Sequence, residues 1–335
     1  MARVNLPVLA ALALASPGAA QDTPDQGSAR AAITDYARLL VTEHRPAEAF
    51  ARYYAADLIQ HDPWIGDGAN GDDDFLARRQ EEQPDKYDPV ESYATVVHAI
   101  LTDGELVAIK SHVFTSAQDS GRLFVDIWRL ENGRFAEHWD VIQPVEGGSG
   151  ALALAACDAG TTYAAAKEAG DTVIRPACGQ PDLTADSATS RQIVLDYLAL
   201  GQEPGRMADA VNRYLAPDFV QHSPNIAPGR QGLIAYMAAR AAARTADNRR
   251  SSIARVLADH DMVLVHRRVT SDSNPRGVAY IDLFRVAGGH IVEHWDVIQP
   301  IPAFSVSGRA MVEGPLEPDR NHGPPPPEHP TGASE

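Results

Sequence analysis

The octapeptide Glu-His-Trp-Asp-Val-Ile-Gln-Pro occurs twice in the chain, at Glu137–Pro144 and at Glu293–Pro300. Each copy holds two carboxylates, an imidazole and an indole within four residues. Carboxylates and imidazoles commonly move protons in general acid–base catalysis. An aspartate among aromatic side chains loses hydration, which raises its pKa and makes it a usable acid or base near neutral pH. The repeated octapeptide is therefore either a duplicated acid–base site or scaffold copied with its domain.

The duplication extends beyond the octapeptide. Gln60-His61 and Gln221-His222 each lie two residues before a proline, at an offset of 161, whereas the strands around the octapeptides match at an offset of 156. We therefore expect about five extra residues in the first copy, between the Gln-His pair and the sheet, near the sequence DGANGDDD. A period this long indicates two whole domains, because solenoid repeats span only ~20–50 residues.

Each copy changes from helical to strand patterning along its length. In the first copy, helical spacing of apolar residues predicts three helices before residue 84, the second of them carrying Phe50 and Tyr54. Alternating patterns then predict four strands, with Asn132-Gly133 as the turn of the last hairpin. Gly288-Gly289 has the same place in the second copy. Helices followed by an antiparallel sheet indicate the α+β class.

Strand alternation predicts which side chains share a face. With a two-residue turn, Trp128 lies opposite Glu137 and Asp126 opposite Trp139, and a shift of one residue would exchange the faces. One face is thus predicted to hold Asp126, Trp128, Glu137 and Trp139, and in the second copy Asp282, Phe284, Glu293 and Trp295. The other face is predicted to hold His138, Asp140, His294 and Asp296. We expect these two histidines to bind neighbouring carboxylates where the sheets meet.

Three helices, a four-stranded sheet, the Gln-His-x-Pro sequence and the closing octapeptide together resemble the SnoaL-like family of the nuclear-transport-factor-2-like superfamily. The resemblance covers residues 29–145 and 187–302. It implies two tandem cone-shaped domains, each with about three helices packed on a curved antiparallel sheet and a pocket under the helices. Cones of this family commonly pair through their sheets, which implies an intramolecular pseudo-dimer.

The resemblance also implies a catalytic histidine on one strand and an aspartate on the next. His112 would hold a substrate oxygen and Asp126 would move the proton. In the second copy Asp282 matches, but Arg268 replaces the histidine, and His266 lies two residues earlier on the same face. An alternative for Arg268 with Asp282 is water activation, as in epoxide hydrolases that share this cone. The family cyclases need neither a cofactor nor a metal.

Other residues are expected to contact the substrate. His61 and His222 would hydrogen-bond the ligand at the pocket rim, or would instead cap the preceding helix. His61, His138 and Asp140 could offer metal ligands, but no further ligand follows at a recognisable spacing, so we expect no metal. The remaining side chains expected to line the two pockets are Trp128, Glu137, Trp139, Phe284, Glu293 and Trp295.

The leading functional hypothesis is cofactor-free acid–base catalysis on a small, largely apolar carbonyl compound, of the aldol-cyclase or isomerase kind. A periplasmic protein that only binds a small hydrophobic ligand is the main alternative, and an envelope-associated structural module is a third. The sequence has no Gly-rich phosphate loop, nucleophile elbow or CxxC motif, which argues against nucleotide and acyl-enzyme chemistry. A net charge of −16 argues against nucleic acid or an anionic membrane as partner.

The ends and the middle of the chain differ from the repeats. Residues 1–20 read as a signal peptide cleaved after Ala20, because the apolar run is too short for a bilayer core of ~30 Å. We therefore expect a periplasmic or secreted protein, with a disulfide between Cys157 and Cys178. No later segment is apolar enough to span a membrane. The predicted organisation is a first domain at 21–146, a linker at 147–186, a second domain at 187–303 and a Pro-rich disordered tail at 304–335.

Overall fold

The computed structural model describes residues 24–82, 93–117, 120–145, 163–168, 181–223, 225–242 and 248–312. They form two α+β domains with the same order of elements. The elements of the first domain are α1 (Pro24–Ala37), the π-helix η1 (Arg38–Thr42), α2 (Pro46–Tyr53), β1 (Tyr54–Gln60), α3 (Gly71–Glu82), β2 (Ala94–Asp103), β3 (Leu106–Phe114), β4 (Arg122–Glu131) and β5 (Arg134–Pro144). Those of the second domain are α6 (Ser187–Gln202), α7 (Met207–Tyr214), β6 (Leu215–Gln221), α8 (Gly229–Ala242), β7 (Arg250–Asp259), β8 (Met262–Thr270), β9 (Val278–Ala287) and β10 (His290–Pro300).

Each domain has one five-stranded sheet, in the order β1-β5-β4-β3-β2 and β6-β10-β9-β8-β7. The four consecutive strands of each sheet pair antiparallel, as the alternation predicts. The fifth strand, β1 or β6, pairs in parallel with the last one. This strand was missed, because its first residue, Tyr54, continues the apolar pattern of the helix before it.

The predicted hairpin turn between β4 and β5 is present. Asn132 and Gly133 have φ values of 53° and 74°, and Gly288 and Gly289 have φ values of 57° and 79° in the second domain. Two successive positive φ values belong to the type I′ turn, which glycine and asparagine adopt at low cost.

The strand after this turn contains a β-bulge, which simple strand alternation does not predict. Leu130 pairs with Phe135, but Arg129 pairs with Glu137, so Ala136 is one extra residue on β5. The same shift occurs between β9 and β10. A bulge of one residue moves every later side chain of the strand to the opposite face.

The extra residues of the first copy lie later than expected. Gly71 and Gly232 have the same environment, because a Cβ on either would meet the carbonyl oxygen of the residue five positions earlier. The offset of 161 therefore persists into the third helix of each domain. The insertion lies between α3 and β2, not near the sequence DGANGDDD.

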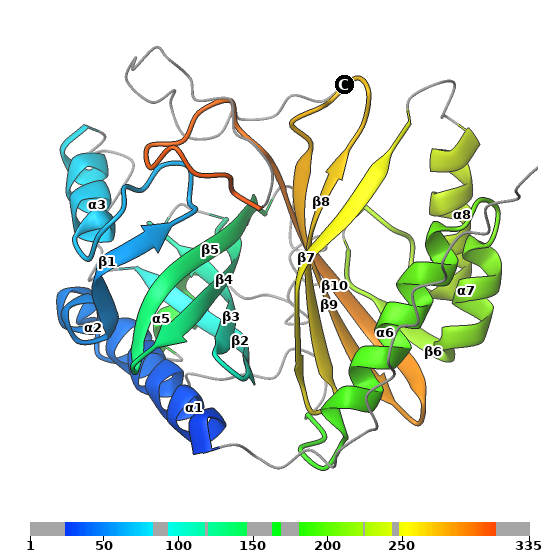
Figure 1. Cartoon of the computed structure of the whole chain (residues 1–335), viewed down its shortest axis with the longest axis horizontal. Helices are drawn as coiled ribbons and strands as arrows, with labels where there is room; N and C mark the ends of the chain where they lie inside the picture. Colours follow the sequence, from blue (N-terminus) through cyan, green and yellow to red (C-terminus); the bar gives the residue numbers. More distant parts are fainter. Residues whose placement is uncertain are drawn as a thin grey trace, which may run out of the picture.

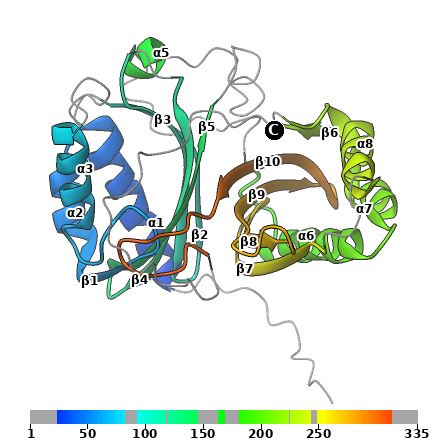
Figure 2. The same cartoon turned by 90° about the horizontal axis from the view of Figure 1, so that it is seen from above.

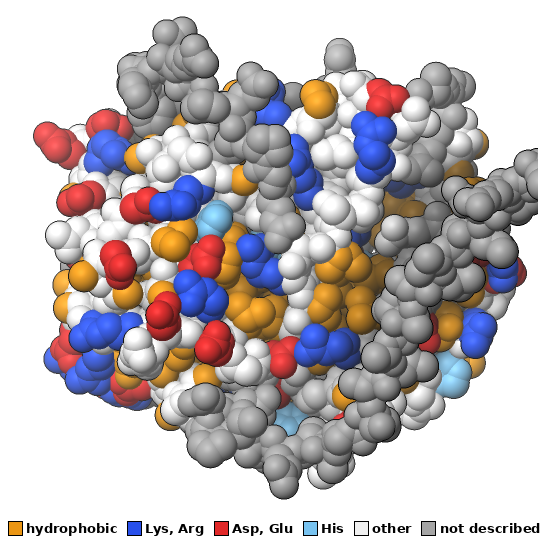
Figure 3. Space-filling view, viewed as in Figure 1, with side chains coloured by type: hydrophobic (Ala, Val, Ile, Leu, Met, Phe, Trp, Pro, Cys, Tyr) orange, Lys and Arg blue, Asp and Glu red, His pale blue; other side chains and the backbone are white. Residues whose placement is uncertain are grey.

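The two sheets pack against each other between the helices, which lie on the outer flanks (Figures 1 and 2). A hydrophobic cluster that includes Leu123, Trp139, Leu264 and Trp295 lies between the sheets. A second cluster lies between sheet and helices in each domain. Figure 3 shows acidic and basic side chains interspersed over the first domain and hydrophobic side chains near the centre of the face.

The contacts between the sheets are reciprocal. Gln143 accepts a hydrogen bond from the backbone N–H of Ile298 (2.8 Å), and Gln299 accepts one from that of Ile142 (2.6 Å). These pairs are related by the offset of 156. Reciprocal contacts of this kind define a two-fold interface, here between two halves of one chain.

The turns between the first two antiparallel strands repeat this exchange. Asp103 binds Arg191 of the second domain, and Asp259 binds Arg30 of the first. Each aspartate also accepts a hydrogen bond from a backbone N–H of the other domain, at 2.9 Å. The turns therefore join the domains at a second, equally symmetric point.

A C-terminal segment breaks this symmetry. Residues 301–312, named here the strap, return from β10 to the first domain beside β1 (Figure 1, orange-red). The backbone N–H of Val306 donates to the carbonyl of Pro63 (2.9 Å), and the Phe304 and Trp64 rings meet edge to face at 5.8 Å. The prediction of a disordered tail from residue 304 is therefore wrong for residues 304–312.

Parts of the predicted linker and tail lie outside the described residues. Within the linker, α5 (Tyr163–Glu168) packs its Ala166 against β2. Cys157 and Cys178 are not among the described residues, so their disulfide stays a prediction. None of the described helices has an apolar stretch long enough to cross a bilayer.

Candidate functional site

The bulge at Ala136 decides which residues of the octapeptide reach the cavity of the first domain. Asp126 pairs with Asp140, and Trp128 pairs with His138. All four of these side chains line a cavity between the sheet and the helices. The predicted grouping is therefore wrong for His138 and Asp140, which share the face of Asp126.

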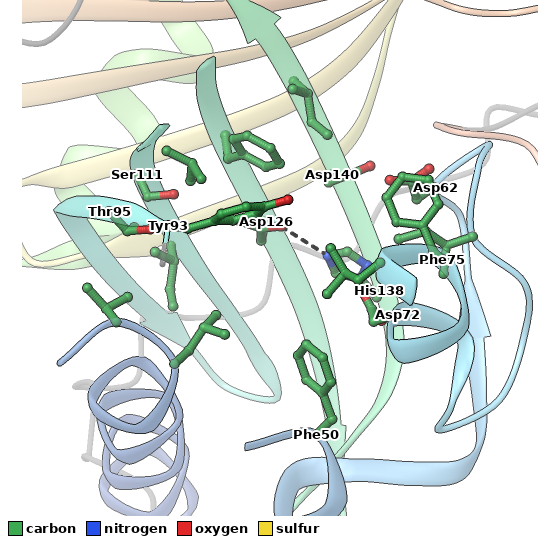
Figure 4. Close-up of a pocket in the computed structure, with 18 of the residues that line it drawn as sticks. Phe50, Asp62, Asp72, Phe75, Tyr93, Thr95, Ser111, Asp126, His138 and Asp140 are labelled. Atoms are coloured by element: carbon green, nitrogen blue, oxygen red, sulfur yellow. Dashed lines mark hydrogen bonds and ion pairs between the residues drawn. The ribbon is translucent and has the colours of Figure 1, made fainter. Parts of the chain in front are cut away.

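This cavity has a volume of about 200 Å³. A cavity of ~150 Å³ lined by apolar side chains holds a benzene molecule, so this one suits a small ligand. Its lining is mainly apolar and aromatic and includes four carboxyl groups, those of Asp62, Asp72, Asp126 and Asp140. Figure 4 shows Asp126, His138 and Asp140 on neighbouring strands, with Asp62 and Asp72 approaching from the loop after β1 and from α3.

His138 is held between Gln60 and Asp126. The backbone N–H of Asp62 donates to Oε1 of Gln60 (3.0 Å), which fixes the orientation of that amide. Oε1 also lies 2.8 Å from Nδ1 of His138, so Nδ1 must carry a proton and donate. The other ring nitrogen, Nε2, lies 3.3 Å from Oδ1 of Asp126. The exchangeable proton therefore lies between His138 Nε2 and Asp126.

Charges around the imidazole favour its protonated form. Burial opposes the charge on His138, but the hydrogen bond and charge of Asp126, together with Asp72 and Asp62, raise its pKa above the ordinary value. The Trp128 ring stacks on the imidazole at 5.0 Å. A cation over an aromatic face is stabilised by the negative ring face, which adds to the same preference.

The remaining carboxyl groups resist ionisation. Burial, followed by the charge of Asp62 and a hydrogen bond with it, raises the pKa of Asp140 well above its ordinary value. Burial raises the pKa of Asp72 to about 6, although His138 opposes this shift. Two carboxyl groups in hydrogen-bond contact cannot both be ionised cheaply, and this contact with Asp62 favours the protonated form of Asp140. The cavity thus holds both a proton acceptor and a proton donor.

The second domain repeats the relay. His294 Nδ1 lies 2.9 Å from Gln221 Oε1, and its Nε2 lies 3.1 Å from Asp282 Oδ1. Gln221 is again oriented by a backbone N–H, that of Ser223. Phe284 replaces the tryptophan against the imidazole, at 4.8 Å. The frame of the site is therefore common to both copies.

Three substitutions change the charged groups of the second site relative to the first. At the position of Ser111 stands Arg267, whose guanidinium binds both oxygens of Asp282. Although burial opposes it, Arg267 followed by His294 lowers the pKa of Asp282. An arginine-bound carboxylate is a weak base. Ser223 and Leu233 take the places of the two further carboxyl groups, Asp62 and Asp72.

The predicted pairing of His112 with Asp126 is wrong. Asp126 pairs with Ile109 on β3, and His112 pairs with Leu123, on the other face of the sheet. His112 is fully buried, donates from Nε2 to the carbonyl of Ser120 (3.2 Å) and packs against Phe114. The separation of fourteen residues does not fix which residues pair. Pairing depends on the register of β3 against β4, and this register puts His112 three residues beyond the partner of Asp126.

The predicted roles of His266 and Arg268 are also wrong. Both lie on the face of β8 opposite Asp282, because Val265 is the residue paired with that aspartate. His266 is buried between the sheets, 3.2 Å from a guanidinium nitrogen of Arg255. Arg268 is half-buried and donates to the carbonyls of two residues in the following loop. The arginine that binds Asp282 is Arg267, one residue before Arg268.

Glu137, Trp139 and His61 face the second domain and do not line the cavity. His61 stacks on Trp139 at 4.9 Å and lies 2.9 Å from Glu137, while its Nδ1 donates to a carbonyl of the strap. The opposite face of Trp139 receives the guanidinium of Arg255 from the other domain at 3.5 Å. The prediction that these three residues contact the substrate in the pocket is therefore wrong, because they lie in the interface between the domains.

The second copy contributes the reciprocal arrangement. His222 stacks on Trp295 at 4.8 Å and lies 3.8 Å from Glu293, and Lys110 of the first domain lies 5.6 Å from the Trp295 ring. Lys110 is 2% exposed, and burial lowers its pKa to about 7. The octapeptide thus alternates between cavity and interface: histidine and the second acid face inward, and glutamate and tryptophan face the other domain.

Among the described residues, no group of three or more histidine, cysteine, aspartate or glutamate side chains has the geometry of a metal site. Sequence reasoning also missed residues of the cavity. Asp62 and Asp72 follow β1 and begin α3, where no periodic pattern marks them. Gln60 did have a signal in the sequence. A glutamine precedes the histidine in both copies, and this repeat could have identified Gln60 as a functional residue.

The family model for the SnoaL-like domain matches residues 33–138 and 195–294, together more than half of the chain. The chain belongs to the SnoaL-like domain family. Both matched regions include the glutamine, aspartate and histidine of a relay. A comparison with curated proteins gave no match.

Solved structures of single domains are similar to parts of this tandem SnoaL-like chain. A "Putative SnoaL-like polyketide cyclase" from Jannaschia sp. CCS1 is 21% identical and aligns over 36% of this chain and 91% of its own, with a TM-score of 0.27. An ntf2-like protein of unknown function from Mesorhizobium loti is 21% identical over 36% and 97%, with a TM-score of 0.29. A "putative ketosteroid isomerase" from Kribbella flavida DSM 17836 is 18% identical over 41% and 97%, with a TM-score of 0.30.

Proposed function

We propose that the cavity of the first domain is a cofactor-independent acid–base site that acts on a small, largely apolar carbonyl compound. The observation that carries this proposal is His138, held between Gln60 and Asp126 with one exchangeable proton. A general base must lie within hydrogen-bond reach of its proton relay and of the substrate. The Asp126–His138 pair meets the first condition and lines the cavity, which offers the second.

The proposed reaction begins with removal of a proton next to the carbonyl carbon. The proton passes to the Asp126–His138 pair, and the C–H electrons form an enolate. The protonated Asp62–Asp140 pair donates a hydrogen bond to the enolate oxygen, in a site shielded from water. Return of the proton to another carbon completes an isomerisation. Attack of the enolate carbon on a second carbonyl would instead complete an aldol closure.

Exchange of α-protons for deuterium tests this function. Asp126→Asn keeps the shape of the side chain and removes the base, so exchange into a panel of small ketones in D₂O should fall by ~10²–10⁴-fold by NMR. Asp282→Asn is the matched control in the second domain and should leave exchange within a few-fold of the parent. Equal loss in both variants would contradict assignment to the first cavity. Ketones that bind without exchange in the parent protein would favour the non-catalytic binder.

We propose further that the protein acts outside the cytoplasm. The basis is the N-terminal signal-like sequence together with two cysteines in a chain of this length. Intact-mass measurement of the protein recovered from a periplasmic fraction should show loss of residues 1–20 and, before reduction, two fewer hydrogens at Cys157 and Cys178. An uncleaved N-terminus would contradict export by this route.

A further inference from the structure

Around His138, the cavity of the first domain holds more carboxyl groups than basic side chains. Four carboxyl groups line it, from Asp62, Asp72, Asp126 and Asp140, against one imidazole in hydrogen-bond contact with them. The arginines of the lining lie elsewhere. Arg122 is four residues before Asp126 on β4, ~13 Å along the strand, and Arg79 is seven residues after Asp72 on α3, ~10 Å along the helix.

Two carboxyl oxygens and the indole N–H of Trp128, all on side chains that line this cavity, are buried without a hydrogen bond to the described residues. Asp140 is 3% exposed, and its Oδ1 has no hydrogen-bond partner among the described residues. Oδ2 of Asp72 is also buried and has no hydrogen-bond partner in the part of the chain that the structure describes. A buried polar atom that lacks a partner costs free energy, which a ligand able to donate hydrogen bonds would recover.

The second domain shows what such a ligand would resemble. There Arg267 places a guanidinium against Asp282, under the ring of Tyr280 at 4.5 Å. Nη1 of the same guanidinium lies 3.4 Å from the hydroxyl of Ser251. An acid, an aromatic ring and a hydroxyl thus surround a cation that the chain itself supplies.

The first domain has the same surroundings without the built-in cation. Asp126 takes the place of Asp282. Phe124 takes that of the tyrosine, and Thr95 that of the serine, and all three line the cavity. Ser111, in place of the arginine, is too short to reach the aspartate as a guanidinium does, and the space is left to the cavity (Figure 4).

We propose that the first cavity binds a small organic cation, a guanidinium, amidinium or ammonium group on an apolar body, with the charged group between Asp126 and Phe124. The apolar body would lie against Trp128 and Tyr36 farther along the lining. As a statement about a substrate, this inference rests on the proposed function, and it names a carbonyl compound that also carries a basic nitrogen. As a statement about binding, it stands on the match of Asp126 to the arginine-bound Asp282 and on the space beside Ser111.

Calorimetric titration of the full chain with phenylguanidinium tests the inference, with phenylurea as a neutral compound of nearly the same shape. Phenylguanidinium is expected to bind one per chain and at least tenfold more tightly than phenylurea. Asp126→Asn should weaken phenylguanidinium at least tenfold and leave phenylurea unchanged. Equal affinity of the two compounds, or no effect of Asp126→Asn, would overturn the proposal.

Exchanging the residues that distinguish the two domains gives a sharper result. Ser111→Arg supplies the cation from the chain and should abolish phenylguanidinium binding, with thermal unfolding confirming that the variant is folded. Arg267→Ser should open the second site and raise the stoichiometry from one to two. A stoichiometry that stays at one contradicts the use of Arg267 as a guide to the first cavity.

These measurements separate the inference from the proposed function, because binding by calorimetry requires no turnover. Deuterium exchange into neutral ketones without phenylguanidinium binding would reject the cation and retain the acid–base site. Phenylguanidinium binding without exchange into any ketone, including amino ketones, would retain the cation site and reject the catalysis.

Discussion

The two domains share a relay and differ in what surrounds it. In both, a glutamine and an aspartate hold a histidine at the wall of the sheet. In the first domain, carboxyl groups crowd the histidine, whereas in the second an arginine binds the aspartate. The hydrogen-bonded frame therefore does not determine the chemistry of the site. Single residues on the neighbouring strand and loop set its charge.

The largest expected effect comes from making the first domain resemble the second. Ser111→Arg should place a guanidinium on Asp126 and lower the rate of α-proton exchange at least ~100-fold, because an arginine-bound carboxylate is a weaker base and the substrate loses its space. NMR exchange rates measure this. Ser111→Thr adds one methyl group without charge and is the control. A loss of similar size with threonine would point to crowding alone.

A smaller effect is expected from the glutamine that orients the imidazole. Gln60→Ala removes the acceptor of His138 Nδ1 and should lower the exchange rate ~10–100-fold, as losses of orienting partners commonly do. Gln221→Ala makes the same change in the second domain and should leave the rate unaltered. Gln60→Glu keeps an acceptor and adds negative charge, which raises the pKa of His138 further. Its pH–rate profile should therefore move to higher pH, a shift that general destabilisation does not produce.

Lys110 distinguishes the domains at their interface, where the second copy has His266. Because burial lowers the folded-state pKa of Lys110 to about 7, from an unfolded value of ~10.5, the unfolded chain binds more protons between these values. Stability should rise with pH across this window, and the contribution is lost as pH falls towards 7. Lys110→Met should stabilise the protein by roughly 1–3 kcal/mol at pH 7 and flatten the pH dependence in urea unfolding. Destabilisation at pH 7 would show that the charged amine has a compensating partner.

The smallest effect is expected from a substitution in the strap. Phe304→Ala removes the edge-to-face contact with Trp64, a cavity residue, and should weaken ligand binding in the first domain about threefold. Exposed Val306 offers a control, since Val306→Ala keeps the backbone hydrogen bond to Pro63. Calorimetry with phenylguanidinium measures both. Equal effects of the two substitutions would deny a specific role for the aromatic contact.

The sequence predicted the two copies, their α+β order and the hairpin turn at Asn132-Gly133, because each follows from local patterning. It did not predict the faces of β5. One inserted residue, Ala136, reverses them, and alanine at a bulge has no distinguishing signal. The error moved His138 out of the predicted site and brought Glu137 into it.

Residues that reach the cavity from outside the sheet were still harder to predict from the sequence. Asp62 and Asp72 are placed by the loop after β1 and the start of α3, so their proximity to His138 is a property of the tertiary fold. Burial of Lys110 likewise depends on the second domain covering its sheet. Periodicity within one copy contains no information about either.

The strap also has a consequence for the order in which the molecule can be completed. A chain is made from its N-terminus, and domains commonly fold as they emerge. The first domain can therefore form its sheet early, but the loop carrying Asp62 and Trp64 meets its partners in the strap only after the second domain has been synthesised. The earlier half of the protein thus gains these contacts only after the later half has been made, and a chain truncated before the strap would hold the relay without the contacts that support the loop of Asp62 and Trp64.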